Sequence, residues 1–117
     1  MVKEILIIDD EQEDLDNTKK ILEKEDYIVE TATDGAQALD KLTGNGFDLV
    51  LIDIRMPTLS GYDLLRLLRE RLNHKVKMIY VSIVPEKEVD MTDIDGFVQK
   101  PFSSEDLLDK IKTVLGK

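Results

Sequence analysis

Two short apolar runs in this chain end in aspartate. The run 5–8 leads into Asp9 and Asp10, and the run 49–52 leads into Asp53. Apolar runs of this length are typical of strands that are buried on both faces of a parallel sheet. If these two strands are parallel and adjacent, three carboxylates meet at one edge of the sheet. That crowding is costly unless a cation joins the carboxylates or one of them takes up a proton. The pattern therefore predicts a hard divalent metal site, or chemistry on one of the three aspartates.

The rest of the chain alternates between strand-like runs and segments of helical periodicity. This order favours an α/β fold with a parallel sheet. We expect strands at 4–8, 28–32, 48–52, 77–82 and around 97–98, and helices at 13–25, after Asp34, after Ser60 and after Ser103, with residues 44–46 ending the second helix. The predicted fold is flavodoxin-like: a doubly wound five-stranded parallel sheet of order 2-1-3-4-5. Ligands bind such sheets beyond the carboxyl ends of the strands, where the strand order reverses, and the three aspartates fall at that point.

Length and composition limit the class of protein. A chain of 117 residues fits one domain, so we expect residues 1–117 to form a single domain with no effector domain. The formal charge of −9 argues against direct binding to nucleic acid, and the absence of cysteine excludes disulfide and thiol chemistry. There is no apolar stretch long enough to cross a membrane and no signal-peptide pattern, which predicts a cytoplasmic location.

Four expected strand ends each contribute one chemical group. They are the pair Asp9 and Asp10, Asp53, Ser82 and Lys100. Asp53 opens the run 53–57 (DIRMP), with Gly61 following, and Lys100 is followed by Pro101 and Phe102. Together and in this order, these motifs resemble the receiver domain of two-component response regulators, in its stand-alone, chemotaxis-type form. The resemblance extends over the whole chain.

The resemblance implies a phosphoryl acceptor and a metal site. Asp53 would be the nucleophile that forms an aspartyl phosphate. Asp10, Asp53 and the backbone carbonyl of Arg55 would bind Mg²⁺ (or Mn²⁺), while Asp9 would act through water. Mg²⁺ prefers octahedral oxygen ligands and retains several waters, which suits a small set of carboxylates and a phosphate oxygen.

The same resemblance implies a switch. Lys100 would neutralise charge on the phosphoryl group, and the hydroxyl of Ser82 would donate a hydrogen bond to it. Phe97, which matches an aromatic position of the family but carries no hydroxyl, would then turn inward. The resemblance also implies a cis peptide bond at Lys100-Pro101, although trans is the default for any such bond.

The implied function is phosphorylation-dependent signalling. A sensor histidine kinase or a phosphotransfer protein would supply the phosphoryl group, and an unknown downstream protein would read it. No external substrate would be turned over, because the domain would catalyse only its own phosphorylation and dephosphorylation. It would be a monomer that is able to dimerise when phosphorylated, and it would bind neither nucleic acid nor membrane.

Several polar residues have an ordinary interpretation. The acids at positions 11, 13, 14 and 16 favour a helix N-terminus, and we expect them to be solvated. His74, the only histidine, lies in a polar stretch and receives no role.

Two departures from the family pattern stand out. Ile83 follows Ser82 where the family usually has a small residue, so we expect slower reaction with small phosphodonors, and a faster Ile83→Ala variant. The segment 83–96 is several residues shorter than in typical receivers and contains Pro85 with an acidic run. We therefore expect the fourth helix to be very short or missing. The surface around that helix, which commonly contacts partners in the family, would then differ from the family pattern.

Two other functions compete with this one. A phosphohydrolase of the haloacid-dehalogenase type also uses a nucleophilic aspartate at a strand end with Mg²⁺, but it needs a second aspartate two residues later. Asp53 is followed by Arg55 at that distance, and Asp9 by Glu11, so neither fits. The other alternative is a degenerate receiver that binds a partner without phosphorylation, which Ile83 and the short segment would permit.

Overall fold

The structure, a computed structural model, describes residues 2–44, 46–72 and 76–116. Its strands are β1 (Glu4–Ile8), β2 (Ile28–Ala32), β3 (Leu49–Ile52), β4 (Lys77–Ser82) and β5 (Gly96–Gln99). Its helices are α1 (Gln12–Glu23), α2 (Gly35–Gly44), α3 (Gly61–Arg71) and α4 (Ser104–Val114), with a 3-10 turn η1 (Glu86–Glu88). His74 and Asn45 lie outside the described residues. None of these helices has the length and apolar character that crossing a membrane requires.

The five strands form one parallel sheet in the order β2-β1-β3-β4-β5. β1 pairs with both β2 and β3, and Ile8 at its end lies opposite Ala32 and Ile52. The carboxyl ends of β1 and β3 are therefore level with each other at the point where the strand order reverses. This confirms the predicted fold class and strand order.

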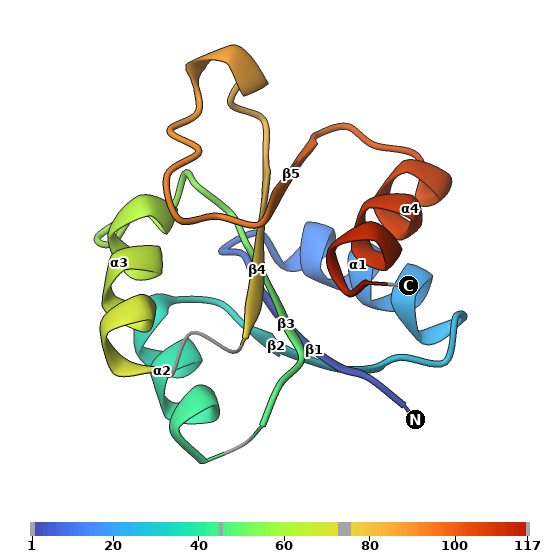
Figure 1. The fold of residues 1–117 in the computed structure, drawn as a ribbon, viewed down its shortest axis with the longest axis horizontal. Coiled ribbons are helices and arrows are strands. Elements are labelled where there is room, and N and C mark those ends of the chain that lie inside the picture. The colour runs from blue at the N-terminus through green and yellow to red at the C-terminus, as the bar shows by residue number, and fades with distance from the viewer. Residues whose placement is uncertain (1, 45, 73–75, 117) are drawn as a thin grey trace.

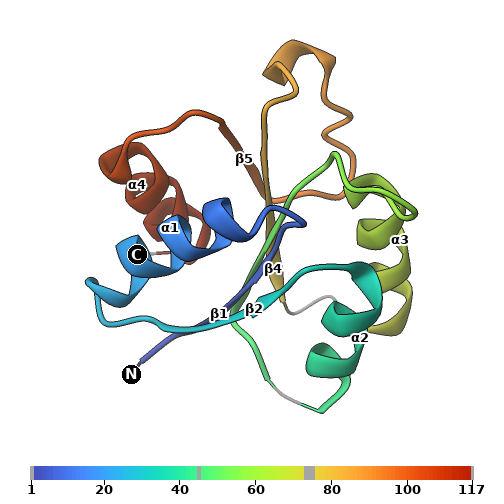
Figure 2. The same cartoon turned by 180° about the vertical axis from the view of Figure 1, so that it is seen from behind.

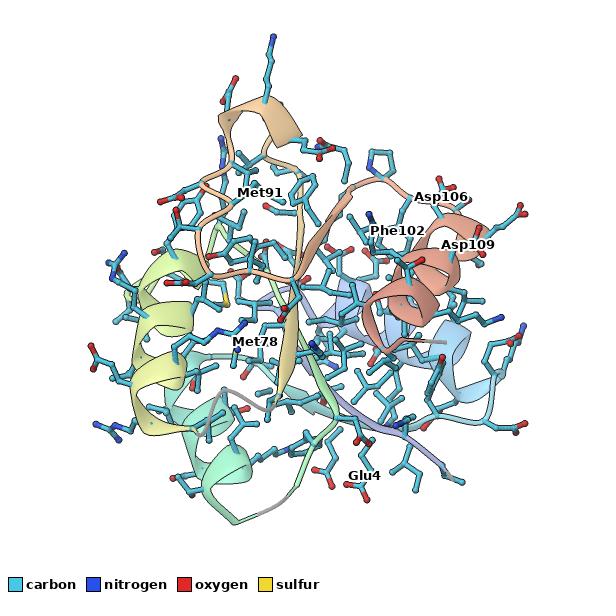
Figure 3. The ribbon with its side chains drawn as sticks, in the orientation of Figure 1. Glu4, Met78, Met91, Phe102, Asp106 and Asp109 are labelled. Atoms are coloured by element: carbon cyan, nitrogen blue, oxygen red, sulfur yellow. The ribbon has the colours of Figure 1, made fainter. Side chains whose placement is uncertain are left out.

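Helices cover both faces of the sheet (Figures 1 and 2). α2 and α3 pack on one face over a cluster that includes Leu6, Val50 and Met78, and Figure 3 shows Met78 within the sheet. α1 and α4 pack on the other face over Ile5 and Leu51. Alternate residues of one strand thus enter different clusters, which explains why the strands read as unbroken apolar runs.

Three helices begin at the predicted capping residues. The backbone N–H of Gln37 donates to the Asp34 carboxylate at 2.9 Å. Ser60 accepts from the N–H of Asp63 and Ser103 from the N–H of Asp106, at 3.2 Å and 3.0 Å. These bonds satisfy backbone donors that the first turn of a helix leaves free.

No regular helix lies between β4 and β5. The described segment contains only η1, followed by extended and turn residues that project beyond the end of β4 (Figure 1). The shortened fourth helix that the sequence predicts is confirmed. Met91 lies on this segment and is exposed (Figure 3).

Candidate phosphorylation site

The strand ends carry the site residues, and the backbone ladder positions them. The N–H of Asp9 donates to the carbonyl of Ala32, and the N–H of Asp53 donates to the carbonyl of Ile8 at 2.9 Å. On the far side, the N–H of Lys100 donates to the carbonyl of Ser82 at 2.8 Å. Each residue directly after a strand is thus held by its neighbour strand, and all of them converge on one edge of the sheet.

The three aspartates form a compact cluster. One carboxylate oxygen from each of Asp9, Asp10 and Asp53 lies within 4.8 Å of the others. Asp9 and Asp53 are only 5% and 7% exposed, while Asp10 faces solvent. A divalent cation would neutralise this repulsion, and carboxylate oxygens are its preferred ligands.

Burial and charge act on Asp53. Desolvation, followed by the negative charge of Asp9, raises the pKa of Asp53 from 3.8 to about 7. The positive charge of Lys100 and a hydrogen bond from the backbone N–H of Arg55 oppose this rise, and Asp10 adds to it. Asp53 is therefore the carboxyl group at which a proton and a cation compete most directly.

Asp9 is already occupied by protein donors. One of its carboxylate oxygens accepts the N–H of Glu11 at 3.0 Å, and the other accepts the ammonium of Lys100 at 2.7 Å. Asp10 and Asp53 have no comparable bond to Lys100 among the described contacts. This difference leaves Asp10 and Asp53 better suited to direct metal binding than Asp9.

Lys100 is largely buried and doubly paired. Its Nζ donates to Asp9 and, at 3.0 Å, to Asp14 on α1. Burial alone would lower the pKa of Lys100, but the hydrogen bonds to Asp9 and Asp14 outweigh it and raise the pKa. The ammonium therefore carries a permanent positive charge beside Asp53. The peptide bond between Lys100 and Pro101 is cis.

Asp14 was missed by the sequence analysis, which assigned it to a solvated helix terminus. Asp14 does lie in the first turn of α1 and its side chain is 48% exposed, but its carboxylate also binds Lys100, a contact that the interpretation did not include. In the structure Thr18, one turn further along α1, is buried, so position 14 lies toward the sheet. A polar threonine gives no such signal in the sequence, and the partner, Lys100, is far away along the chain.

The loop after Asp53 requires one glycine and tolerates one strained residue. A Cβ on Gly61 would lie 2.4 Å from the carbonyl oxygen of Asp53, so only glycine fits there. Thr58 has a φ of 71°, and the N–H of Leu59 donates to the carbonyl of Pro57 at 2.7 Å across it. This is a tight three-residue turn with an unfavourable backbone for a β-branched residue.

The two residues expected to switch are both buried. The Oγ of Ser82 accepts the N–H of Val84 at 3.3 Å. Phe97 packs into the cluster under α2 and α3, together with Tyr80, Val84 and Val89. Phe97 thus already lies inward in this structure, so the expected inward turn has no outward position to start from here. Val84 and Val89 of the β4–β5 segment belong to the same cluster.

Ile83 lies on the outside of the site. It is 56% exposed and lines a cavity of about 290 Å³ together with Asp14, Lys100 and Phe102. Figure 3 shows Phe102 at the start of α4. The apolar side chain of Ile83 therefore lines the same solvent-accessible cavity as Lys100. The effect of Ile83 on small phosphodonors stays a prediction.

The family model for the response regulator receiver domain matches residues 5–112. The chain belongs to the response regulator receiver domain family. The acidic cluster and Lys100 lie at the carboxyl edge of the sheet, where the family resemblance led us to expect them. The family match rests on sequence alone and is independent of this geometry.

The sequence of this receiver domain is similar to the sequences of larger response regulators. The response regulator SaeR of Staphylococcus aureus is 33% identical over 116 residues, covering 95% of this chain and 50% of SaeR. The chain thus spans about half the length of the curated relatives it matches.

Solved structures give the same fold. The response regulator TrrA of Thermotoga maritima, solved in complex with Mg²⁺ and a beryllium fluoride, has a TM-score of 0.88 and 30% identity, covering 97% of this chain and 99% of TrrA. A CheY-like receiver domain protein of Methanospirillum hungatei has a TM-score of 0.86 and 34% identity, covering 99% of this chain and 95% of that one. Receiver domains belong to two-component signalling, and so does this chain.

Proposed function

We propose that this receiver domain accepts a phosphoryl group on Asp53. The observation that carries the proposal is the buried carboxylate of Asp53, flanked by Asp9 and Asp10 and facing the charge of Lys100. Phosphoryl transfer needs mainly positioning and neutralisation of charge, and this arrangement is able to supply both.

Asp10, Asp53 and the backbone carbonyl of Arg55 would hold Mg²⁺, with Asp9 acting through water. The fit rests on the oxygen-only donor set and on the repulsion among three carboxylates that lie within 4.8 Å. When bound, the cation supplies positive charge to the oxygens of the transferred group. Mn²⁺ has the same preference for oxygen ligands and would serve in its place.

The donor would be a phosphohistidine on a sensor histidine kinase or a phosphotransfer protein. A carboxylate oxygen of Asp53 forms a bond to phosphorus as the phosphorus–nitrogen bond of the donor breaks, and the electron pair of that bond stays on the imidazole. Later attack by water on the same phosphorus returns inorganic phosphate and the free carboxylate. No turnover of an external substrate is part of the proposal.

Output would follow from a population shift. A phosphoryl group adds about one to two negative charges and new acceptor oxygens. Lys100 and the hydroxyl of Ser82 would turn toward it, which removes the acceptor of the Val84 N–H and loosens the packing around Phe97. A downstream protein would read this change. A cytoplasmic location, a monomeric state that changes to a dimer on phosphorylation, and the lack of nucleic-acid binding stay predictions.

Mass spectrometry tests the proposal. The protein is incubated with a small phosphodonor and Mg²⁺, and we expect one added phosphoryl group. Asp53→Asn should remove it, while Asp40→Asn, which changes an exposed aspartate on α2, should keep it. No added mass on the wild-type protein, from a small donor or from a phosphorylated phosphotransfer protein, would favour a degenerate receiver that acts without phosphorylation.

A further inference from the structure

The ammonium of Lys100 is shared between two carboxylates of different character. Asp9 accepts it at 2.7 Å and Asp14 at 3.0 Å. The side chain of Lys100 is 13% exposed, and that of Asp14 is 48% exposed. Asp9 is therefore a buried member of the acidic cluster, and Asp14 is reachable from water.

Asp14 is firmly placed by its helix. α1 packs on the sheet through Leu15, Thr18 and Leu22, and position 14 follows from that packing. The carboxylate stands at the rim of the cavity that Lys100 and Ile83 also line. Its contact with Lys100 joins α1 to the residue after β5, across the sheet edge that holds Asp53.

An ammonium group has three donors, and here two of them are used on carboxylates. The third donor has no partner among the described residues, but the two ion pairs hold the ammonium between Asp9 and Asp14. Turning the side chain of Lys100 toward a phosphoryl oxygen on Asp53 would therefore weaken part of this pairing. Release of Asp9 is costly, because Asp9 is buried and an unpaired buried charge is strongly unfavourable. Release of Asp14 costs much less, because water replaces the lysine at a half-exposed carboxylate.

We propose that Asp14 is a positioning residue that competes with the phosphoryl group for Lys100, and so sets how strongly the phosphorylated state is favoured. The inference rests on the proposed function of Asp53. Asp14 stabilises the unphosphorylated arrangement through its ion pair, and after release its negative charge still opposes the anionic phosphoryl group. Both effects have the same sign, so removal of the Asp14 charge should favour the phosphorylated state.

Beryllofluoride, a non-covalent substitute for the phosphoryl group, provides the test. Its affinity for the full chain is measured in the presence of Mg²⁺, after thermal unfolding has shown that each variant is folded. We expect Asp14→Asn to bind beryllofluoride about two to five times more tightly than wild type, as the loss of a partly exposed ion pair implies. Asp14→Ser is the second variant, and it should change the affinity in the same direction.

Two control variants distinguish a specific effect of Asp14 on Lys100 from the general effect of removing a negative charge and from a change in the fold. Glu13→Gln removes the same charge from the same turn of α1 at an exposed side chain, and it should change the affinity by less than about twofold. Asp14→Glu restores the carboxylate and should return the affinity toward the wild-type value. In the absence of beryllofluoride, the NMR signals of the Lys100 side chain should shift in Asp14→Asn but not in Glu13→Gln.

The two hypotheses fail differently. If wild-type protein binds no beryllofluoride with Mg²⁺, the proposed function of Asp53 is wrong. If wild type binds it and both Asp14 variants match Glu13→Gln or bind more weakly than wild type, Asp14 does not compete for Lys100 and the inference is overturned.

Discussion

The acidic edge of the sheet and the neighbouring β4–β5 segment are held in place by different means. At the acidic edge, the residues follow strands directly, and the backbone ladder fixes them before any side chain acts. The segment 83–95 has one 3-10 turn, and it is attached to α3 largely through side chains. Arg69 donates to the carbonyls of Val76 and Asp93 and to the carboxylate of Asp95, which in turn accepts the N–H of Met78.

The difference shows how the acidic edge is able to form without a regular helix in the described segment between β4 and β5. Tyr62 on α3 accepts the N–H of Asp90 and packs edge-on against Tyr80. Together with Arg69, it satisfies backbone groups that a helix would satisfy internally. The conformation of the segment between β4 and β5 therefore depends on a few side-chain hydrogen bonds from α3. The positions of the acidic residues depend on the backbone hydrogen bonds of the sheet.

The free energy of unfolding should depend on the charge of Asp53, because this carboxylate lies in the acidic cluster. Its raised pKa of about 7 means that the folded protein holds a proton there where the unfolded chain has lost it. The folded state binds more protons between about pH 4 and 7, so stability falls as pH rises through that window. Without divalent cations, we expect Asp53→Asn to raise the free energy of unfolding by roughly 2–4 kcal/mol at pH 8 and by almost nothing at pH 4.

Urea unfolding at the two pH values, with a chelator present, measures this difference. Glu70→Gln, at an exposed position of α3, should give no pH-dependent gain. A gain from Asp53→Asn that is the same at both pH values would show that the raised pKa is not its cause.

Gly61 links the acidic edge to α3 and should tolerate no side chain. Because a Cβ would lie 2.4 Å from the backbone oxygen of Asp53, Gly61→Ala should lower the free energy of unfolding by about 2–3 kcal/mol. Gly44→Ala, at the open end of α2, has no atom within 4 Å of its new Cβ and should be neutral or slightly stabilising. Denaturant unfolding of the two variants gives the comparison, and equal effects would contradict the close approach.

Arg69 should be the main attachment of the β4–β5 segment. We expect Arg69→Ala to cost about 2 kcal/mol, because it leaves the Asp93 carbonyl without its donor and the Asp95 carboxylate with the N–H of Met78 but no cation. Arg66→Ala, one turn earlier on the same helix, loses an exposed pair with Asp63 and a weaker charge interaction with Asp90, and should cost less than about 0.5 kcal/mol.

Hydrogen exchange locates the effect of Arg69. Amide protection should fall in the segment 84–95 and remain at the Asp53 N–H, which bonds to the carbonyl of Ile8. Equal loss of protection at both places would mean that the edge and the segment are one cooperative unit.

Tyr62 should make a smaller contribution to the same attachment. Tyr62→Phe keeps the ring packed on Tyr80 but removes the acceptor of the Asp90 N–H, at a cost of up to about 1 kcal/mol. The measurement is amide exchange at Asp90, which should become faster. Tyr27→Phe, on the opposite face of the sheet, serves as the control and should leave Asp90 unchanged.

Local patterns predicted most of the fold. The strands 4–8, 28–32 and 77–82 and the caps Asp34, Ser60 and Ser103 agree with the structure. The first helix ends at Glu23 and not at residue 25, because the chain turns there and Asp26 adopts a φ of 69°. Nothing in the periodicity marks that turn, since polar residues suit both a helix end and a loop.

The candidate site divides in the same way. By itself, the sequence determined that Asp9, Asp10 and Asp53 follow buried strands, because apolar runs report burial and the first polar residue marks a strand end. Only the tertiary structure decided the partners of the charged side chains. Lys100 and Asp14 are 86 positions apart, and Arg69 and Asp95 are 26 apart. Such pairs depend on how whole helices pack on the sheet and on side-chain conformation, and periodicity along one segment carries no record of either.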